Sequence, residues 1–231
     1  MKCAVDLHMH SCLSPCGDMD MTPNNIVNMS KLKGLDMIAV TDHNTALQLP
    51  VIKQVADYVG IALLPGLEVT TKEEAHMLAY FKTVDEAVDF SGFIYPHLPP
   101  IKNKPKLFGV QAYMDEDDEI TSEEEKLLIT ALDLSIDDLF TEITKRGGLA
   151  IPAHINRGAN GLLQALGFVP SQLPFKALEV TKGLPLPHKG LPDVKHLHSS
   201  DAHYLENIFE REEFIELPQP TPQAFFDYIE A

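Results

Sequence analysis

The feature that most constrains this chain is the hexapeptide Val5-Asp6-Leu7-His8-Met9-His10, which lies almost at the N-terminus. Its apolar residues Val5 and Leu7 predict a short buried strand. Alternate side chains of a strand point the same way, so His8 and His10 would face one spot. Two neutral imidazoles that project together from a strand end provide half of the inner shell of a transition-metal ion. An isolated His-x-His pair also occurs as two surface or core histidines, and the rest of the chain decides between these interpretations.

Length and composition limit the class of protein. A chain of 231 residues with 45% hydrophobic and 23% charged residues can bury one sizeable core, so we predict a single domain over residues 1–231. No apolar run reaches the roughly 18 residues of a membrane helix, and the first residues lack a secretion-signal pattern. We therefore expect a soluble, cytoplasmic protein with no membrane partner. The odd number of cysteines, Cys3, Cys12 and Cys16, argues against structural disulfides.

The formal net charge of -16 is strongly acidic, which argues against binding of long nucleic acid through a basic surface. A short nucleic-acid substrate remains compatible with this charge. Much of it comes from Asp115–Glu119 and from residues 123–125, which we interpret as a solvated loop and the start of a helix. His97, in an irregular segment, and His188, in a proline-rich loop, are also expected at the surface.

Further apolar strands, expected at residues 37–40, 149–153 and 194–198, are each followed by side chains that can bind metal ions. These side chains are His43, His154, Asp201 and His203. Glu68 stands in an apolar setting just beyond a strand at residues 61–65. A buried carboxylate without a partner is costly, so Glu68 should face a cation or a proton.

The remaining elements follow from periodicity, capping residues and turn formers. His76 begins a strand at residues 76–81, after a hairpin at residues 72–74. Further strands are expected at residues 177–180 and 214–217, and helices at residues 23–32, 45–58, 123–132 and 135–146 and after Thr221. Between residues 82 and 120 the alternation of strands and helices is lost. We expect an irregular insertion there, either a lid or a surface excursion.

Metal-binding side chains thus lie at the ends of different apolar strands, as in an α/β barrel. The sequence here resembles the PHP family, named from polymerase and histidinol phosphatase domains. The matching pieces, in the family's order, are Asp6-Leu7-His8-Met9-His10-Ser11, Thr41-Asp42-His43, Gly66-Leu67-Glu68, Pro152-Ala153-His154 and Ser200-Asp201-Ala202-His203. The resemblance implies an α/β fold, a distorted TIM-like (β/α)7 barrel, with two or three divalent metal ions and phosphoesterase activity.

The resemblance also implies a role for each ligand. It assigns His8, His10 and Asp201 to one ion, Glu68 as a bridge to a second ion completed by His76 and His154, and His43 with His203 to a third. Family members tend to supply one more ligand, His or Asp, from the loop after His10. This chain departs from that pattern, because Cys16 stands there, with Asp18 as the alternative if the loop bulges. A thiolate is a competent ligand for Zn or Fe, and the mixed donor set suits Mn, Fe and Zn alike.

Other residues have open roles. Arg157 is either a clamp for phosphate oxygens or part of a surface salt bridge. Asp42 would orient an imidazole through its second nitrogen rather than bind a metal. His196 and His198 form a second His-x-His pair inside a strand, where they would fill the barrel or lie behind the ligands. Glu179 has the strand-end position of a site residue but no assigned role.

These features lead to the hypothesis of a hydrolase in which a hydroxide bridging two metal ions attacks phosphorus. Arg157 would stabilise charge on the phosphoryl oxygens, and Asp42, His198 or His203 would transfer the proton to the leaving group. The substrate would be a nucleotide, the end of a short oligonucleotide, or a small phosphorylated metabolite.

Two rival functions remain at this point. The first is an amidohydrolase, a class that also begins with His-x-His but commonly bridges its metals with a modified lysine. Here Glu68 occupies the bridging position and no strand-end lysine matches. The second rival is a non-catalytic metal-binding module. Nearly the whole ligand set is retained, which speaks for catalysis. The sequence does not determine the oligomeric state.

Overall fold

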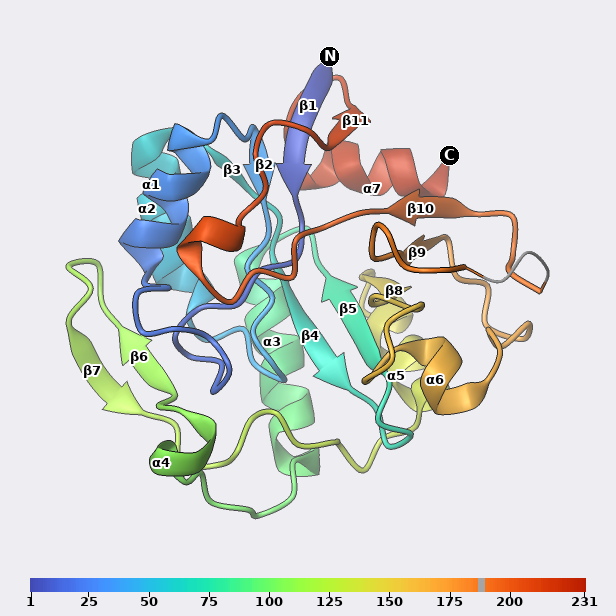
Figure 1. The fold of residues 1–231 in the computed structure, drawn as a ribbon, viewed down its shortest axis with the longest axis horizontal. Coiled ribbons are helices and arrows are strands. Elements are labelled where there is room, and N and C mark those ends of the chain that lie inside the picture. The colour runs from blue at the N-terminus through green and yellow to red at the C-terminus, as the bar shows by residue number, and fades with distance from the viewer. Residues whose placement is uncertain (187–189) are drawn as a thin grey trace.

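The computed structural model describes residues 1–186 and 190–231, so the expected surface position of His188 lies outside the described residues. The chain forms a mixed α/β fold, with short strands in the middle and helices around them (Figure 1). No described helix is both long enough and apolar enough to cross a membrane.

The strands form four small sheets. The first has the order β11-β1-β2-β3 and the second β4-β5-β8, while β9 pairs with β10 and β6 pairs with β7. Their bounds are β1 Lys2–Asp6, β2 Met37–Ile38, β3 Ala62–Leu63, β4 Gly66–Thr70, β5 His76–Tyr80, β6 Ala112–Met114, β7 Ile120–Glu123, β8 Leu149–Pro152, β9 Ala177–Glu179, β10 Lys195–Leu197 and β11 Phe214–Glu216. The strands and helices confirm the α/β class. None of these sheets closes on itself within the described residues, so a complete barrel is not seen.

The sheets are mixed in direction rather than all parallel. Strands β1, β2, β3 are parallel to one another, as are β9 and β10. Strand β5 runs antiparallel to β4, to which a tight turn joins it directly, and it also runs antiparallel to β8. Glu74 in that turn has a φ of 63°, in the left-handed region that tight turns use. The predicted hairpin at residues 72–74 is therefore confirmed.

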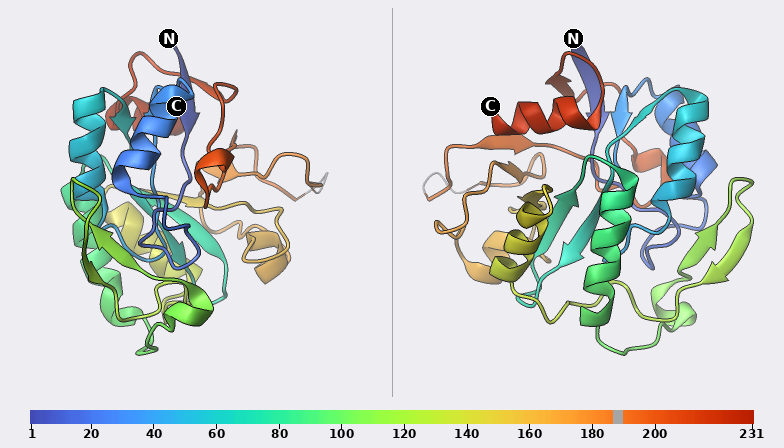
Figure 2. Two further views of the ribbon diagram at one scale, coloured as in Figure 1. Left: turned by 60° about the vertical axis from the view of Figure 1, so that its left-hand side comes forward. Right: turned by 180° about the vertical axis from the view of Figure 1, so that it is seen from behind.

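Helices surround the sheets, and Figure 2 shows α2, α3 and α5 on the side opposite the view of Figure 1. Their bounds are α1 Pro23–Leu32, α2 Leu49–Val59, α3 Val84–Ile94, α4 Pro105–Phe108, α5 Ile136–Lys145, α6 Leu162–Leu166 and α7 Pro222–Glu230, with 3-10 turns η1 Tyr95–His97 and η2 Leu205–Asn207. The predicted starts of α1, α5 and α7 are confirmed, because Thr22, Ser135 and Thr221 each accept a backbone hydrogen bond as N-caps.

The expected helix at residues 123–132 is wrong. Glu123 ends strand β7, and the residues after it form turns and irregular chain. The run of glutamates favours a helix locally, but the Glu124 carboxylate accepts the hydroxyls of Tyr95 at 2.9 Å and Tyr113 at 2.7 Å. These tertiary contacts, together with the β6-β7 pairing, outweigh helix propensity. The helix expected at residues 45–58 begins later, at Leu49.

The segment at residues 82–120 is more regular than expected. It contains α3, which starts at a capping box in which Thr83 and Glu86 bond each other's backbone N–H groups. It also contains β6, which forms a hairpin with β7 at the end of the segment, and these two strands project at one side of the molecule (Figure 1). The acidic run Asp115–Glu119 forms the turn of this hairpin at the surface, as expected for a solvated loop.

Side-chain packing beneath the strands holds the backbone that leads into His8. Phe225 of α7 packs edge-on against Tyr80, with ring centroids 5.7 Å apart. The buried Tyr80 hydroxyl donates to the carbonyl oxygen of Leu7 at 2.6 Å. Leu7 directly precedes His8, so the core holds the backbone that presents the first histidine.

Candidate metal centre

The N-terminal His-x-His pair lies just past the end of β1, and both imidazoles are completely buried. Their Nε2 atoms are 3.2 Å apart. Between them, Met9 forms a parallel bridge with Ala202, which brings Asp201 to the same place. The Asp201 Oδ1 atom lies 3.1 Å from His10 Nε2 and 3.4 Å from His8 Nε2. The spacing therefore produces the convergent pair that the sequence predicts.

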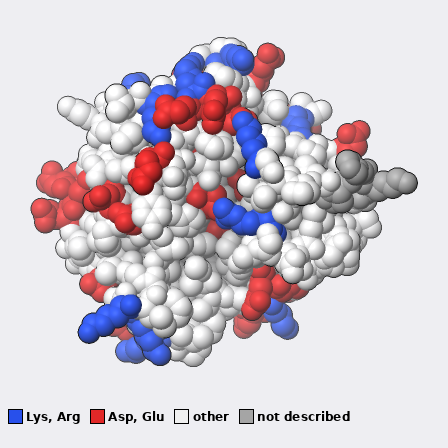
Figure 3. Space-filling model, in the orientation of Figure 1, with Lys and Arg blue, Asp and Glu red and all other residues white. Residues whose placement is uncertain are grey.

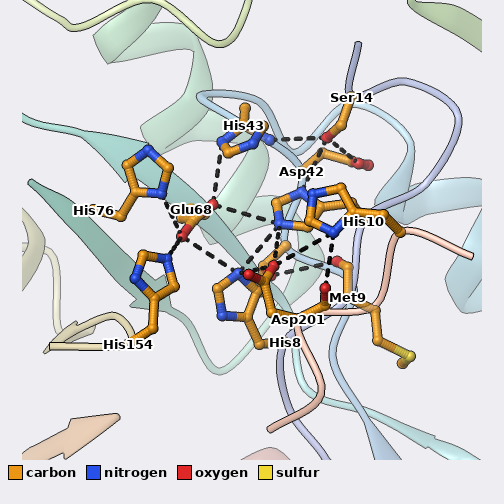
Figure 4. Close-up of polar contacts among 12 residues, drawn as sticks. His8, Met9, His10, Ser14, Asp42, His43, Glu68, His76, His154 and Asp201 are labelled. Carbon is orange, nitrogen blue, oxygen red and sulfur yellow. Dashed lines mark hydrogen bonds and ion pairs between the residues drawn. The ribbon is translucent and has the colours of Figure 1, made fainter. Parts of the chain in front are cut away.

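Glu68, in the middle of β4, is the centre of the cluster (Figure 4). Its carboxylate is 1% exposed and lies among nitrogen atoms of five imidazoles. The distances are 3.4 Å to His8, 3.4 Å to His10, 3.1 Å to His43, 2.8 Å to His76 and 3.0 Å to His154. A carboxylate in the middle of a strand that lies among so many imidazole nitrogens has the position required of a bridge between ions.

The charges of the cluster are strongly coupled. Burial would raise the pKa of Glu68, but the neighbouring imidazoles, His76 and His8 first among them, hold it well below its usual range. Burial would likewise lower the pKa of His8, but the carboxylates of Glu179, Glu68 and Asp201 hold it well above the usual value. The carboxylates thus remain ionised in a buried site, where only nearby cationic groups can balance them.

Unpaired polar atoms indicate that a cation fits here. Within the described part of the chain, several buried side-chain atoms make no hydrogen bond of normal geometry, although some of them lie close to Glu68 or His10. They include His43 Nδ1, both ring nitrogens of His76, His154 Nδ1 and Asp201 Oδ1. Leaving such an atom unsatisfied costs about 1–3 kcal/mol, which a bound cation would offset. Burial and the neighbouring His10 lower the pKa of His43, so its imidazole is neutral and can donate a lone pair.

Three overlapping groups have donor atoms within 4.8 Å of one another: His8, His10 and Asp201; His43, Glu68 and His76; and His10, Cys16, His43 and His203. The first coincides with the expected ligand set of one ion. In the second, His43 accompanies Glu68 and His76, whereas His154 was expected there; His154 Nε2 still contacts Glu68. The donor types fit a transition metal such as Mn, Fe or Zn.

The third group contains Cys16 rather than the alternative, Asp18. The Asp18 carboxylate accepts the backbone N–H of Asp20 at 2.9 Å, within its own loop. The loop is tightly folded, since a Cβ at Gly17 would lie 2.2 Å from the Ser11 carbonyl oxygen. Burial, together with Glu68 and Asp201, raises the pKa of the Cys16 thiol, and a nearby cation would lower it again.

Behind the ligands, two acceptors hold imidazoles by their Nδ1 atoms. Glu179 contacts His8 Nδ1 at 3.0 Å, which gives a place to a residue whose role the sequence left open. Ser14, which the sequence did not single out, contacts His10 Nδ1 at 3.2 Å. Asp42 was expected to orient an imidazole directly. It instead accepts the Ser14 hydroxyl at 2.7 Å, so it acts on His10 through that hydroxyl. The motif Ser-x-x-Ser after His10 was the available signal.

The cluster forms the floor of a cavity of about 160 Å³. It is lined by Cys16, His43, Glu68, His76, Ile129, His154, Arg157, Ala159, Asn160, Asp201 and His203. Figure 3 shows this face, where acidic and basic side chains both border a central hollow. Arg157 forms an ion pair with Asp201 inside the cavity, so it is not part of an isolated surface salt bridge.

His198 lies elsewhere. It donates its Nδ1–H to the Val180 carbonyl oxygen at 2.7 Å and borders a separate small cavity together with His196. The structure therefore does not bring His198, expected as a proton carrier, to the cavity that contains the cluster.

Two residues of the cluster have an uncommon backbone conformation. His154 has a φ of 27° and Asp201 a φ of 52°, in the left-handed region that non-glycine residues rarely adopt. Such strain persists only where surrounding contacts impose it, and it concentrates at functional sites.

Comparisons with known proteins agree with this geometry. A family model described as PHP domain matches residues 6–156. A protein of Shewanella sediminis named as a probable phosphatase is 31% identical over 112 residues, which are 43% of this chain and 44% of that protein. The chain thus spans less than half the length of the curated relatives it matches.

Two solved structures share the fold. An endonuclease Q, solved with a 27-mer duplex that carries an abasic lesion at the active site, has a TM-score of 0.74 at 18% identity, covering 100% of this chain and 57% of that chain. A candidate metal-dependent phosphoesterase from Bifidobacterium adolescentis has a TM-score of 0.63 at 17% identity, with 97% of this chain and 95% of that chain covered. At these identities the likeness establishes the fold alone.

Proposed function

The chain belongs to the PHP domain family, and from this premise we propose that it is a metal-dependent phosphoesterase. The observation that carries the proposal is the buried Glu68 carboxylate among five imidazoles, beside a cavity that holds one arginine. The match to a probable phosphatase agrees with it.

The ligands we propose are His8, His10 and Asp201 for one ion, Glu68 as the bridge, and His76 with His154 for a second ion. His43, His203 and Cys16 would hold a third. Divalent Mn, Fe or Zn bound there would activate water and polarise phosphoryl oxygens. The three cysteines are free in the structure, which agrees with a reducing compartment such as the cytoplasm.

Arg157 is the residue we propose to bind the substrate phosphate. Its backbone N–H donates to the His154 carbonyl oxygen at 2.8 Å, which ties it to the ligand turn. Its side chain is 41% exposed, so it can reach both Asp201 and a molecule in the cavity. A planar guanidinium can bind two oxygens of one phosphate.

His203 is better placed than His198 to handle a proton. It lines the cavity, and its Nδ1–H donates to the Asp201 carbonyl oxygen at 2.8 Å. Its Nε2 therefore keeps a lone pair that can bind an ion or take up a proton. Asp42 is buried, does not line the cavity, and supports His10 through Ser14.

The substrate we propose is small: a nucleotide, a phosphorylated metabolite, or the end of a short oligonucleotide. A cavity of about 160 Å³ over the cluster can accommodate a phosphoryl group. The net charge of -16 opposes binding of a long polyanion.

We further propose that the strands form a distorted seven-stranded barrel. Pairing supports the orders β1-β2, β4-β5-β8 and β9-β10. Isolated bridges between His43 and Glu68 and between Met9 and Ala202 link β2 to β4 and β10 to β1. The backbone N–H of Ile155 donates to Glu179 at 2.9 Å, which links β8 to β9.

The amidohydrolase alternative is less well supported. Its usual bridge is a modified lysine, and among the described residues that line the cavity none is a lysine. Glu68 already takes the bridging place.

The test is nitrophenol release from nitrophenyl phosphate and from bis-nitrophenyl phosphate by the Mn-loaded protein, beside a chelated sample. We expect release that chelation abolishes and Mn restores. The ester that reacts separates a monoesterase from a diesterase. Release that is unaffected by chelation, or none from either ester or from a panel of nucleotides, would contradict the proposal.

A further inference from the structure

Glu179 is the last residue of β9, and its side chain is 4% exposed. It is not among the residues grouped as metal donors, nor does it line the cavity. It nevertheless contacts two residues of the centre, His8 and His154. Their rings lie almost parallel, with centroids 5.8 Å apart, and the Nε2 atom of each contacts Glu68 Oε1 (Figure 4).

The contact with His8 determines which ring nitrogen is free. His8 Nδ1 lies 3.1 Å from Oε1 and 3.0 Å from Oε2 of Glu179. An ionised carboxylate only accepts hydrogen bonds, so Nδ1 carries the proton. With a metal ion in the centre, Nε2 is then the atom that would present its lone pair, on the side of His10 and Asp201.

The contact with His154 fixes a strained backbone. The His154 N–H donates to Glu179 Oε2 at 2.8 Å, and the next N–H, from Ile155, donates to the Glu179 carbonyl oxygen at 2.9 Å. These two bonds hold the turn in which His154 has a φ of 27°. That turn brings His154 Nε2 to 3.0 Å from Glu68.

We propose that Glu179 is a positioning residue that couples the two ion positions, by fixing the ring of His8 and the backbone of His154 with one carboxylate. The inference rests on the proposed metal centre, and it does not depend on which ester is hydrolysed.

The substitution Glu179→Gln tests whether Glu179 positions the two histidines or only fills space in the core. The amide has the shape of the carboxylate but only one accepting oxygen. If the oxygen faces His154, the NH2 group competes for His8 Nδ1 and favours the tautomer with the proton on Nε2. If the amide is reversed, its NH2 group faces the His154 N–H. Either orientation disturbs one of the two histidines.

The experiment measures Zn²⁺ affinity by calorimetry for the wild type and for Glu179→Gln, Glu179→Asp and Glu124→Gln, each first stripped of metal. We expect affinity to fall about 10- to 100-fold in Glu179→Gln, with a far-UV spectrum like that of the wild type. Glu179→Asp keeps the charge but is shorter, and it should also weaken binding. Glu124→Gln removes a carboxylate bonded to two tyrosines outside the centre, and it should bind Zn²⁺ as the wild type does. Wild-type affinity in both Glu179 variants would overturn the inference.

A second measurement needs no variant. In Zn-loaded wild-type protein with ¹⁵N-labelled histidine, we expect the His8 proton on Nδ1 and the metal on Nε2. A proton on Nε2 would overturn the inference even if every variant failed to fold. Both readouts are independent of turnover, so absence of phosphoesterase activity with these results intact would count against the proposed function alone.

Discussion

The two His-x-His pairs of this chain have the same spacing and different surroundings. His8 and His10 lie past the end of a strand, fully buried beside Glu68 and Asp201. His196 lies within β10 and is exposed, while His198, just beyond that strand, bonds a backbone carbonyl oxygen. The spacing only makes two imidazoles face one way. Carboxylates delivered by other strands turn such a pair into a candidate metal site.

The distinction between the two His-x-His pairs would fail if both contributed equally to catalysis. Replacing His8 by Ala removes a ligand of the proposed first ion, so we expect kcat to fall by more than about 100-fold. Replacing His196 by Ala should leave kcat within a factor of about three. Kinetics with the ester that the wild type hydrolyses, at saturating Mn²⁺, provide the check. Equal losses in the two variants would contradict the account.

Chelation should affect stability through the first pair only. A ligand present at about 100 times its dissociation constant stabilises the folded state by about 2.7 kcal/mol. For a chain of this size that corresponds to a fall of roughly 5–10 °C in Tm when metal is removed. Thermal melts with and without chelator should show this shift in wild type and His196→Ala, and a smaller one in His8→Ala. An identical shift in all three would place the metal elsewhere.

Acid should destabilise the metal-free protein through the cluster. Burial and the nearby His10 lower the pKa of His203 to about 4. Between that value and about 6.5, the unfolded chain binds more protons at His203, so stability rises with pH in this window. The stability that depends on neutral His203 is fully present above about pH 6.5 and is lost as the pH falls toward about 4. Urea midpoints in chelator at pH 7 and pH 5 should differ more in wild type than in His203→Gln. Equal differences would contradict this assignment.

The smallest expected effects distinguish the two His-x-His pairs by whether a nearby substitution changes Zn²⁺ affinity. Ser14→Ala removes the hydroxyl that holds His10 Nδ1, and we expect Zn²⁺ affinity to fall about tenfold. It also leaves Asp42 and the His43 N–H without this buried partner, so stability should fall by roughly 1–3 kcal/mol. His198→Ala removes the bond to Val180, which should cost about 1 kcal/mol of stability with no change in Zn²⁺ affinity. Calorimetric binding and urea unfolding of both variants measure the two quantities; a reversed pattern would refute the distinction.

Much of the fold was predictable where local signals and packing agree. Thr22 and Ser135 cap helices that the sequence located almost to the residue, because cap chemistry is local. The helix predicted at residues 123–132 was wrong because local signals and packing disagree there. Glutamate favours a helix, but the tyrosine hydroxyls that donate to Glu124 hold the chain in another conformation. The Thr83/Glu86 capping box of α3 is a local signal in the sequence, but the prolines that follow it favoured an irregular segment.

The site was predictable to the extent that strand ends meet at one edge of a sheet. His8, His10, Glu68 and Asp201 come together as expected. The contacts that hold the imidazoles from behind could not be predicted from the sequence. Glu179, for example, is far from His8 in sequence, and only the fold brings the two together. Asp42 was assigned a direct contact with an imidazole, since a sequence does not reveal that the Ser14 hydroxyl stands between them.

The central claim is that Glu68 bridges ions in a multinuclear centre. The most direct measurement is the metal content per chain of wild type and Glu68→Gln, by elemental analysis after loading with Mn²⁺ and removal of free ions. The account predicts two or three ions in the wild type and the loss of at least one in the variant, with the fold retained by circular dichroism. A wild type that retains no more metal than a chelated sample, or a variant that retains the full content, would contradict it.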